Sequence, residues 1–473
     1  MRLADLRGRS VAVWGTGREG RAAVTAIAGQ APAALVAVDD SATAAPPDWD
    51  SDLAPLHTGE DGFARLAAAD VVVRSPGVPQ THPWVVELRE RGVPITGGTA
   101  LWMADHAART VGVTGSKGKS TTSSLISHLL TALGRPNAFG GNIGVPLLAM
   151  PEADLYVLEL SSYQCSDLTD SPRIAVLTSL FPEHLDSHGS EERYYADKLN
   201  LIAHGPEKII FNGTDLRLAA RLGDSARFGD SAAVGVGRPD SYHLAPGPDG
   251  RPYLHRVGEP LFARAVLPLA GRHNEGNLCV ALAVLESLGV DCVAHRDTIA
   301  DAVAGFAGLP HRLAEIVDPS GLTFVDDSIS TSPYSAMHAI DAYVGRPLTV
   351  IVGGTDRGLD YTPLRDHVAD LELTVIGVPD SGPRILDTLA GLPGVHTALA
   401  DDVPAAVRLA RELTPAGGVV LLSPAAPSYG HFRNFEHRSE VFAAAVHDTA
   451  PVRDAAPGNS AVPATAARGT GAI

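Results

Sequence analysis

Short apolar runs alternate with stretches of helical spacing along most of this chain. Residues 110–113, TVGV, form a β-branched run typical of a buried strand. In residues 119–134, leucine and isoleucine then recur at helical spacing until Gly134, a common stop signal. Other apolar runs, such as VAVW, ALVAV, LTVIV and GVVLL, are also followed by helical patterns. Strands that alternate with helices predict α/β domains built on parallel sheets.

The chain is too long for one hydrophobic core, at 473 residues. We find no internal repeat and predict three α/β segments, over residues 1–108, 109–304 and 305–450. An amphipathic helix near RSEVFAAAVHD closes the third segment. Residues 451–473 are rich in alanine, proline and glycine and have little to bury, so we predict a disordered tail there.

Composition narrows the class of protein. The chain has 37 basic and 54 acidic residues, a net charge of −17, which argues against nucleic-acid or anionic-membrane partners. No run of about 18 apolar residues predicts a membrane span, and the first residues do not resemble a signal peptide. The three cysteines form no C-x-x-C pair, as in a reducing compartment. We therefore expect a cytoplasmic protein.

The stretch GVTGSKGKSTT, residues 112–122, predicts a phosphate-binding loop. It departs from the strict Walker pattern, because Val113 stands where the first glycine is expected. A strand, a glycine loop and a helix N-terminus nevertheless make an anion site, since backbone N–H groups converge there. We expect ATP to contact Gly115, Ser116, Lys117, Gly118, Lys119, Ser120 and Thr121, with Lys119 on the outer phosphates and Ser120 on Mg²⁺. The alternative is an ordinary glycine-rich turn.

A second glycine pattern, GTGREG, follows the strand VAVW and opens a helix. Asp39 lies about 20 residues later, so the stretch is a formal dinucleotide-binding fingerprint. The same backbone would hold NAD, FAD or a UDP-sugar, and a purely structural turn is the alternative. Nothing downstream is typical of hydride transfer, which favours a UDP-type ligand at Gly15, Thr16, Gly17 and Asp39.

Further polar residues follow apolar segments, and each has a structural alternative. Glu159 ends a strand and would hold Mg²⁺, unless it is a surface residue of an edge strand. Asn274 and Asn277 lie three apart at a helix start and would reach a nucleotide or cap the helix. Arg312 would face phosphates and Asp327 a ribose or base. A cluster of Glu183, His184, Asp186 and His188 also suggests zinc, although no cysteine joins it.

Taken together, these motifs resemble those of the Mur ligases, and most closely of the members that add glutamate to UDP-N-acetylmuramoyl-L-alanine. The resemblance runs from residue 1 to about 450. It joins eight segments in order: TGSKGKSTT, GGNIGVPLL, ELSSYQ, PEHLDSH with YYADK, GRHNEGN, GLPHRL, DDSIST and LLSPAAPSYGHFRNFE. It implies a Rossmann-like UDP-substrate domain, a central P-loop ATPase domain and a Rossmann-like C-terminal domain that binds glutamate and ATP.

The resemblance also implies roles for particular residues. UDP-substrate would lie at Gly15, Thr16, Gly17, Asp39, Asn142 and Ser161, near Ser75-Pro76-Gly77. ATP would extend from the central loop to Asn274, Asn277, Arg312 and Asp327. Mg²⁺ would be held by Ser120, Glu159, His184 and Lys198, the last as a carbamate, because an ammonium cannot ligate a cation. Lys119, Lys198 and His184 would be the catalytic residues.

Departures from the usual pattern gather in the expected glutamate pocket. Ile329 and Arg357 stand where the D-glutamate-adding enzymes usually have lysines, and Ala-Pro-Ser replaces Cys-Ala-Ser. By resemblance the pocket is lined by Thr331, Arg357, Ser428, Tyr429 and Phe435. The segments GREGRAA, FPEHLD, DSIST, GGTDRG and SPAAPSYG resemble a branch that adds L-glutamate and whose product a separate epimerase inverts. We therefore favour L-glutamate, with D-glutamate as the alternative.

Two alternative functions from other classes of protein remain. One is an NAD-dependent dehydrogenase, which leaves Lys119 and Glu159 unexplained, and the other is a nucleotide-binding protein without ligase activity. The expected partners are small molecules: UDP-N-acetylmuramoyl-L-alanine, glutamate and ATP. A monomer is one expectation for the assembly, which the sequence does not determine.

Overall fold

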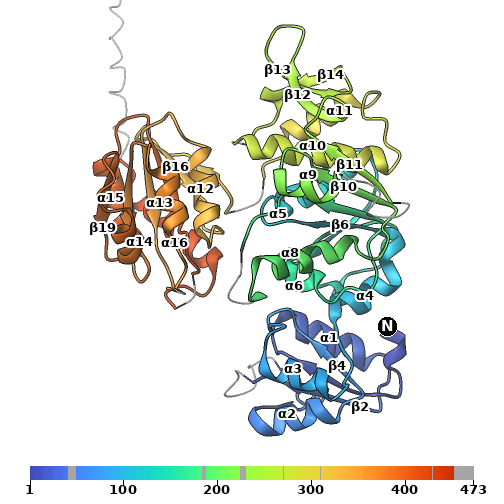
Figure 1. Ribbon diagram of the computed structural model, residues 1–473. Coiled ribbons are helices and arrows are strands. Elements are labelled where there is room, and N and C mark those ends of the chain that lie inside the picture. The colour runs from blue at the N-terminus through green and yellow to red at the C-terminus, as the bar shows by residue number, and fades with distance from the viewer. Residues whose placement is uncertain are drawn as a thin grey trace, which may run out of the picture. The chain divides into compact units, whose positions relative to one another are not determined.

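The computed structural model describes residues 1–40, 49–143, 145–183, 188–223, 231–269, 271–308, 311–356, 358–428 and 430–451. The predicted tail lies outside this range from residue 452 on. The chain divides into two compact units, residues 1–310 and 311–473, which are described one at a time (Figure 1). None of the helices in the described ranges combines the length and the apolarity that a bilayer crossing needs.

The first sheet of the N-terminal unit has five parallel strands in the order β3-β2-β1-β4-β5. Its strands are β1 (Ser10–Trp14), β2 (Ala34–Val38), β3 (Leu56–His57), β4 (Val71–Arg74) and β5 (Ile95–Gly97). Alternate residues of β1 and β4 point to opposite faces, and both faces are apolar. Helices α1 (Arg18–Ala28) and α4 (Gly98–His106) cover one face, and α2 (Gly59–Ala68) and α3 (Pro83–Glu90) the other.

The second sheet of the same unit has six parallel strands in the order β11-β10-β9-β6-β8-β7. They are β6 (Thr110–Thr114), β7 (Ala138–Gly141), β8 (Tyr156–Glu159), β9 (Ile174–Leu177), β10 (Lys208–Asn212) and β11 (Ala232–Val236). One face packs on α5 (Lys119–Ala132), α10 (Arg272–Ser287) and α11 (Arg296–Ala304). The other packs on α6 (Ser162–Cys165), α8 (Glu191–Leu199) and α9 (Leu216–Leu222). The predicted strand and helix around the phosphate loop are confirmed as β6 and α5.

A small antiparallel sheet was not predicted from the sequence. It consists of β12 (Tyr242–Pro246), β13 (Pro252–Arg256) and β14 (Glu259–Ala263), and its apolar residues join the core under α10. Short 3-10 helices complete the N-terminal unit: η1 (Leu3–Leu6), η2 (Ala107–Arg109), η3 (Leu147–Ala149), η4 (Asn200–Ile202) and η6 (Arg264–Val266).

The C-terminal unit contains a six-stranded sheet in the order β15-β16-β20-β17-β18-β19, parallel except for β15. Its strands are β15 (Ala314–Ile316), β16 (Thr323–Asp326), β17 (Leu348–Val352), β18 (Leu373–Gly377), β19 (Val395–Leu399) and β20 (Val419–Leu422). Helices α12 (Pro333–Asp341), α13 (Thr362–Val368) and α14 (Gly382–Leu389) cover one face, and α15 (Val403–Leu413) and α16 (Phe435–Asp448) the other. The predicted closing helix is α16, and the α/β class with parallel sheets is confirmed.

Candidate active site

The phosphate loop connects β6 to α5 through two glycines with positive φ. Gly115 has φ of 151° and Gly118 has φ of 86°. A Cβ on Gly115 would lie 2.0 Å from Oγ1 of Thr178, and one on Gly118 would lie 2.6 Å from Oδ1 of Asn277. Both positions therefore require glycine for space as well as for backbone conformation.

Two hydroxyl residues that the sequence reading missed support this loop. The Ser179 hydroxyl accepts from the backbone N–H of Lys117 (2.8 Å) and donates to its carbonyl (3.0 Å). The Thr178 hydroxyl donates to the same carbonyl at 2.5 Å. Both residues follow β9, the neighbour of β6 in the sheet. Their position at the carboxyl end of an adjacent parallel strand was the signal that would have found them.

Two lysine side chains meet at one carbonyl of the loop. Nζ of Lys119 lies 3.0 Å from the Gly115 carbonyl and 3.1 Å from that of Ser116. Nζ of Lys198, on α8, lies 2.8 Å from the Gly115 carbonyl, and this side chain is buried. Burial and the nearby charge of Lys119 lower the pKa of Lys198 to about 7. The lowered pKa increases the fraction of Lys198 that is a neutral amine near neutral pH.

Glu159 is a buried carboxylate with one unsatisfied oxygen. It ends β8, an interior strand, and pairs in register with Val113 beside the phosphate loop. Its side chain is 1% exposed, which rules out a surface edge position. Oε1 accepts from Nδ2 of Asn142 at 2.8 Å, whereas Oε2 has no hydrogen-bond partner among the described residues. A buried carboxylate oxygen without a donor fits a cation ligand.

Asn274 and Asn277 lie together on α10. Nδ2 of Asn277 donates to Oδ1 of Asn274 at 3.0 Å, and both side chains are buried. Gly271 is the N-cap of α10, so neither asparagine caps the helix. Because Asn277 also contacts Gly118, the structure brings this pair to the phosphate loop.

The residues predicted for UDP-substrate gather around the first turn of α1. The carboxylate of Asp39 accepts from the backbone N–H of Thr16 (3.0 Å) and from its hydroxyl (2.5 Å). A Cβ on Gly20 would lie 1.9 Å from the Gly15 carbonyl, so this glycine lets α1 pack on the turn. Arg18 donates to the Asn142 carbonyl at 3.2 Å and so links the turn to the second sheet.

Ser161, also predicted to bind UDP-substrate, has a structural role of its own. It is the N-cap of α6, and its hydroxyl accepts from the backbone N–H of Gln164 at 3.2 Å. Gln164 in turn contacts Glu19 of α1 through Nε2 at 3.4 Å. The serine therefore shapes α6 beside the N-terminal turn, and its contact with substrate stays a prediction.

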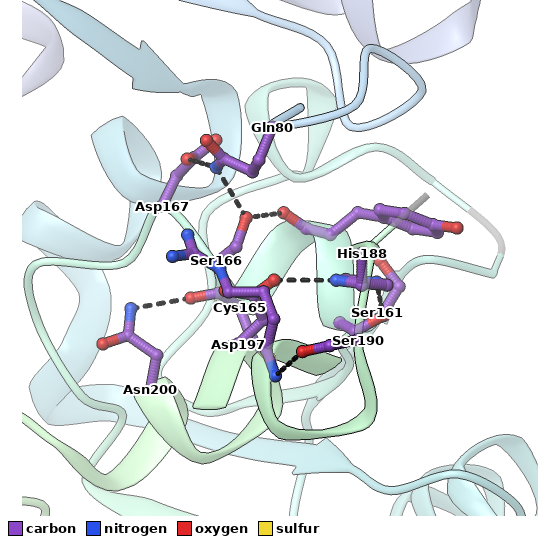
Figure 2. A network of polar contacts seen from close by, with 12 residues as sticks. Gln80, Ser161, Cys165, Ser166, Asp167, His188, Ser190, Asp197 and Asn200 are labelled. Carbon is purple, nitrogen blue, oxygen red and sulfur yellow. Dashed lines mark hydrogen bonds and ion pairs between the residues drawn. The ribbon is translucent and has the colours of Figure 1, made fainter. Parts of the chain in front are cut away.

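A buried contact between Arg74 and Asp167 joins the two parallel sheets of the N-terminal unit. Nη2 of Arg74, at the end of β4, lies 2.6 Å from Oδ2 of Asp167, which follows α6. Gln80 donates to Oδ1 of the same aspartate at 2.6 Å and to the Ser166 hydroxyl at 3.1 Å (Figure 2). Arg74 is 1% exposed, so salt screens this pair much less than a pair on the surface.

In the C-terminal unit, Asp327 lies at the carboxyl end of β16 with Ser423 from the end of β20. Oδ2 of Asp327 accepts from the Ser423 hydroxyl at 2.8 Å. Burial raises the pKa of Asp327 to about 6, although hydrogen bonds from Ser330 and Ser423 and the charge of Arg312 oppose the shift. Nε of Arg312 is buried without a partner among the described residues, which leaves a donor for a ligand.

Arg438, which the sequence reading missed, ties the loops of this unit together. The guanidinium is 1% exposed and donates to the Ser328 hydroxyl (3.0 Å), the Ser328 carbonyl (2.7 Å) and the Ala426 carbonyl (3.1 Å). The Ser328 hydroxyl also donates to the Phe435 carbonyl at 2.8 Å. Arg438 thus fixes the segments that carry the predicted pocket residues Thr331, Ser428 and Phe435.

Several predicted residues lie outside the described part of the chain, namely His184, Arg357 and Tyr429, together with Asp186 of the zinc alternative. Among the described residues no group of three or more histidine, cysteine, aspartate or glutamate side chains is arranged to hold a metal. The ring nitrogens of His188 contact Ser162 and Asp197. Within the described residues, the zinc alternative therefore has no support.

Comparisons with known proteins agree with this geometry. Residues 113–285 match the family model described as the Mur ligase middle domain. A UDP-N-acetylmuramate–alanine ligase from Thermotoga maritima has a similar structure, with a TM-score of 0.58 and 20% identity, over 93% of this chain and 99% of that one. The structure of a MurF ligase from the same organism, in complex with ADP, matches with a TM-score of 0.57 and 18% identity. The match covers 95% of this chain and 97% of that one. These two structures show the fold.

Relatives of higher identity identify the family. One from a Micromonospora strain is 74% identical and covers 95% of this chain and 99% of its own. One from Salinispora tropica is 73% identical, over 95% of this chain and 100% of the relative. One from Xanthomonas oryzae is 38% identical, over 94% of this chain and 96% of the relative. The chain therefore belongs to the Mur ligases, the family predicted from its motifs. All three relatives are named UDP-N-acetylmuramoyl-L-alanine–L-glutamate ligase, the branch that the pocket motifs favoured.

Proposed function

We propose that this protein is an ATP-dependent ligase that joins L-glutamate to UDP-N-acetylmuramoyl-L-alanine in the synthesis of peptidoglycan precursors. The relatives that match nearly the whole chain carry this activity in their names. The observation in the structure that supports it best is the phosphate loop, where Lys119 and Lys198 meet at the Gly115 carbonyl. The chain belongs to the Mur ligases by its relatives, so the dehydrogenase alternative is not retained.

The chemistry follows from the poor reactivity of a carboxylate. The alanyl carboxylate attacks the γ-phosphorus of ATP, the bond to the β,γ-bridging oxygen breaks, and ADP leaves. The amine of glutamate then attacks the acyl phosphate carbonyl, loses a proton, and expels inorganic phosphate as the amide forms. The ammonium of Lys119 lies within the loop. It would therefore stabilise the negative charge that develops on the transferred phosphoryl group.

Mg²⁺ and a carbamate on Lys198 belong to this proposal. Ser120, Glu159 and a carbamylated Lys198 would hold the cation, together with His184, which lies outside the described residues. The unsatisfied Oε2 of Glu159 supports this set, as does the lowered pKa of Lys198, because only a neutral amine adds carbon dioxide. When bound, the cation would neutralise phosphate charge. Burial of Glu159 and Lys198 would keep water from the transfer.

The remaining assignments are also proposals. UDP-substrate would bind at the Gly15 turn, and glutamate at Thr331, Arg357, Ser428, Tyr429 and Phe435. We divide the chain into domains at residues 108 and 304, as the motifs predict. A cytoplasmic monomer would fit these small-molecule substrates, and an epimerase would invert the L-glutamyl product.

The deciding experiment is ADP release by the purified protein with Mg-ATP, UDP-N-acetylmuramoyl-L-alanine and either L- or D-glutamate. We expect turnover with L-glutamate. Lys119→Ala should lower turnover by about a hundredfold or more, because a preorganised charge at the transferred phosphoryl group is lost. Lys208→Ala, at the start of β10, is the matched control and should leave turnover unchanged. Turnover with D-glutamate alone would reverse the stereochemical assignment, and no turnover with either would refute the proposal.

A further inference from the structure

A serine, a histidine and an aspartate form a buried hydrogen-bonded chain beside the phosphate loop. The Ser162 hydroxyl lies 3.0 Å from Nε2 of His188, and Nδ1 of His188 lies 2.7 Å from Oδ2 of Asp197. Figure 2 shows the contact between His188 and Asp197 as a dashed line. The three residues are 2%, 5% and 4% exposed. This chain of contacts is called the Ser162–His188–Asp197 relay below.

The relay has the serine, histidine and aspartate of a hydrolase catalytic triad in the same order of contacts, but its serine is not accessible to a substrate. A nucleophilic serine must meet its substrate, and the Ser162 side chain is buried. Tyr163 stacks on the imidazole of His188 with ring centroids 4.8 Å apart, and Tyr194 meets it edge-on at 5.2 Å. The aromatic rings pack both the face and the edge of the imidazole. The arrangement is therefore suited to holding segments together and not to attacking a substrate.

Each end of the relay lies next to a residue proposed to hold the cation. Ser162 is the first residue of α6, three positions after Glu159 at the end of β8. Asp197 immediately precedes Lys198 on α8, and its other oxygen accepts from Nε of Arg193 at 3.0 Å. One chain of hydrogen bonds thus connects the segment that carries Glu159 with the helix that carries Lys198.

Other contacts hold α6 from both sides. Nδ2 of Asn200, just after α8, donates to the carbonyls of Cys165 and Leu168, both at 2.9 Å. Gln80 reaches Ser166 and Asp167 from the first sheet (Figure 2). These contacts restrain the end of α6 and the residues beyond it. The relay holds the side chain of its first residue, and the Thr114 hydroxyl donates to the carbonyl of Leu160, between Glu159 and α6, at 2.8 Å. The relay is therefore a direct side-chain connection between the segment that follows Glu159 and the helix that carries Lys198.

We propose that Ser162, His188 and Asp197 are positioning residues that set the spacing of Glu159 and Lys198 for a divalent cation. The inference deepens the proposed function and rests on its assignment of these two residues. Mg²⁺ demands nearly ideal octahedral geometry, so a small displacement of one ligand weakens binding. Residues that orient metal ligands typically change metal affinity by about 10- to 100-fold when they are removed.

Manganese binding to the full-length protein tests the inference without turnover. Free Mn²⁺ is measured by electron paramagnetic resonance in bicarbonate buffer, for the wild type, Asp197→Ala and Asp197→Asn. We expect the Mn²⁺ dissociation constant to rise about 10- to 100-fold in Asp197→Ala and less in Asp197→Asn, which keeps the shape and an acceptor. The Mg²⁺ concentration for half-maximal ADP release should rise in parallel, with KM for glutamate unchanged.

Thr414→Val is the control, and it is matched to Ser162→Ala because both remove a buried hydroxyl. The Thr414 hydroxyl contacts that of Thr349 at 2.7 Å in the C-terminal unit. Thr414→Val should leave Mn²⁺ affinity unchanged. A lower melting temperature of Asp197→Ala with wild-type Mn²⁺ affinity would overturn the inference. If Asp197→Ala does not fold, Ser162→Ala decides, since weaker Mn²⁺ binding supports the inference and unchanged binding overturns it. A wild type that releases no ADP would instead refute the proposed function.

Discussion

Single residues in the phosphate loop are constrained by the space around them. Gly118 has φ of 86° and faces Asn277, whereas Gly134, after α5, has φ of 70° and no atom within 4 Å of an added Cβ. The two glycines share a backbone conformation but differ in their surroundings. Comparing them separates backbone strain from loss of contact with α10.

We predict that Gly118→Ala impairs ATP binding and that Gly134→Ala does not. Both changes place alanine at positive φ, which costs about 1 kcal/mol of stability. Gly118→Ala must also displace Asn277, so KM for ATP should rise roughly tenfold or more, equivalent to about 1.4 kcal/mol. Steady-state ADP release and thermal unfolding measure the two effects. Equal KM values in the two variants would contradict the role given to the contact between Gly118 and Asn277.

At the scale of elements, one arginine joins α15, α16 and the turn before β16. The guanidinium of Arg411 lies 2.6 Å from Oδ2 of Asp318 and also donates to the Thr449 hydroxyl at 2.8 Å and the Val446 carbonyl at 2.8 Å. The Asp318 side chain is 1% exposed. Burial by itself would raise the pKa of Asp318, but hydrogen bonds from Arg411 and Ser320 outweigh it and bring the pKa to about 2.

The ion pair of Asp318 and Arg411 should make the free energy of unfolding depend on pH in the acid range. Because the pKa of Asp318 is lower in the folded state, its stabilisation is complete above the unfolded pKa of about 4 and is lost as pH falls toward 2. Denaturant unfolding of wild type and Asp318→Asn should differ by on the order of 1 kcal/mol at pH 7, and the difference should shrink at pH 3. The control is Asp370→Asn, which changes an exposed aspartate two positions after α13. A difference that does not depend on pH would contradict the assignment.

The sequence predicted those strands and helices that a pattern of consecutive residues defines. The strand at 110–113, the glycine loop and the helix after it follow one another in sequence, so apolar spacing alone located them. The β12–β14 sheet was missed because its strands are short and partly polar, as in PYLHR. In the Ser162–His188–Asp197 relay, Ser162 and His188 are 26 positions apart in the sequence. Arg438 contacts Ser328, which is 110 positions away. Only the folded topology brings such partners together.

At the scale of the whole molecule, neither compact unit carries the full set of predicted residues. Lys119, Glu159 and the Gly15 turn belong to residues 1–310, whereas Asp327 and the predicted glutamate pocket belong to residues 311–473. The proposed reaction needs the acyl phosphate and the glutamate amine in contact. Because the motifs assign the substrates to separate domains, we predict domain closure before chemistry.

We predict that the radius of gyration in small-angle X-ray scattering falls when a nonhydrolysable ATP analogue and UDP-N-acetylmuramoyl-L-alanine are both present. The physical reason is that each ligand would contact residues of more than one domain, so bound ligand favours the closed population. Lys119→Ala should show a smaller change at the same concentrations. An unchanged radius in the wild type at saturating ligand would contradict the prediction of domain closure.

The unsatisfied oxygen of Glu159 has a practical consequence. A buried carboxylate oxygen without a donor costs the ligand-free protein stability, and any molecule that satisfies it is favoured only in the folded state. Binding at 100 times the dissociation constant adds about 2.7 kcal/mol to the free energy of unfolding. A dye-based melting assay would therefore rank cations and candidate inhibitors at this carboxylate without any nucleotide-sugar substrate, which makes a screen possible before the substrate is synthesised.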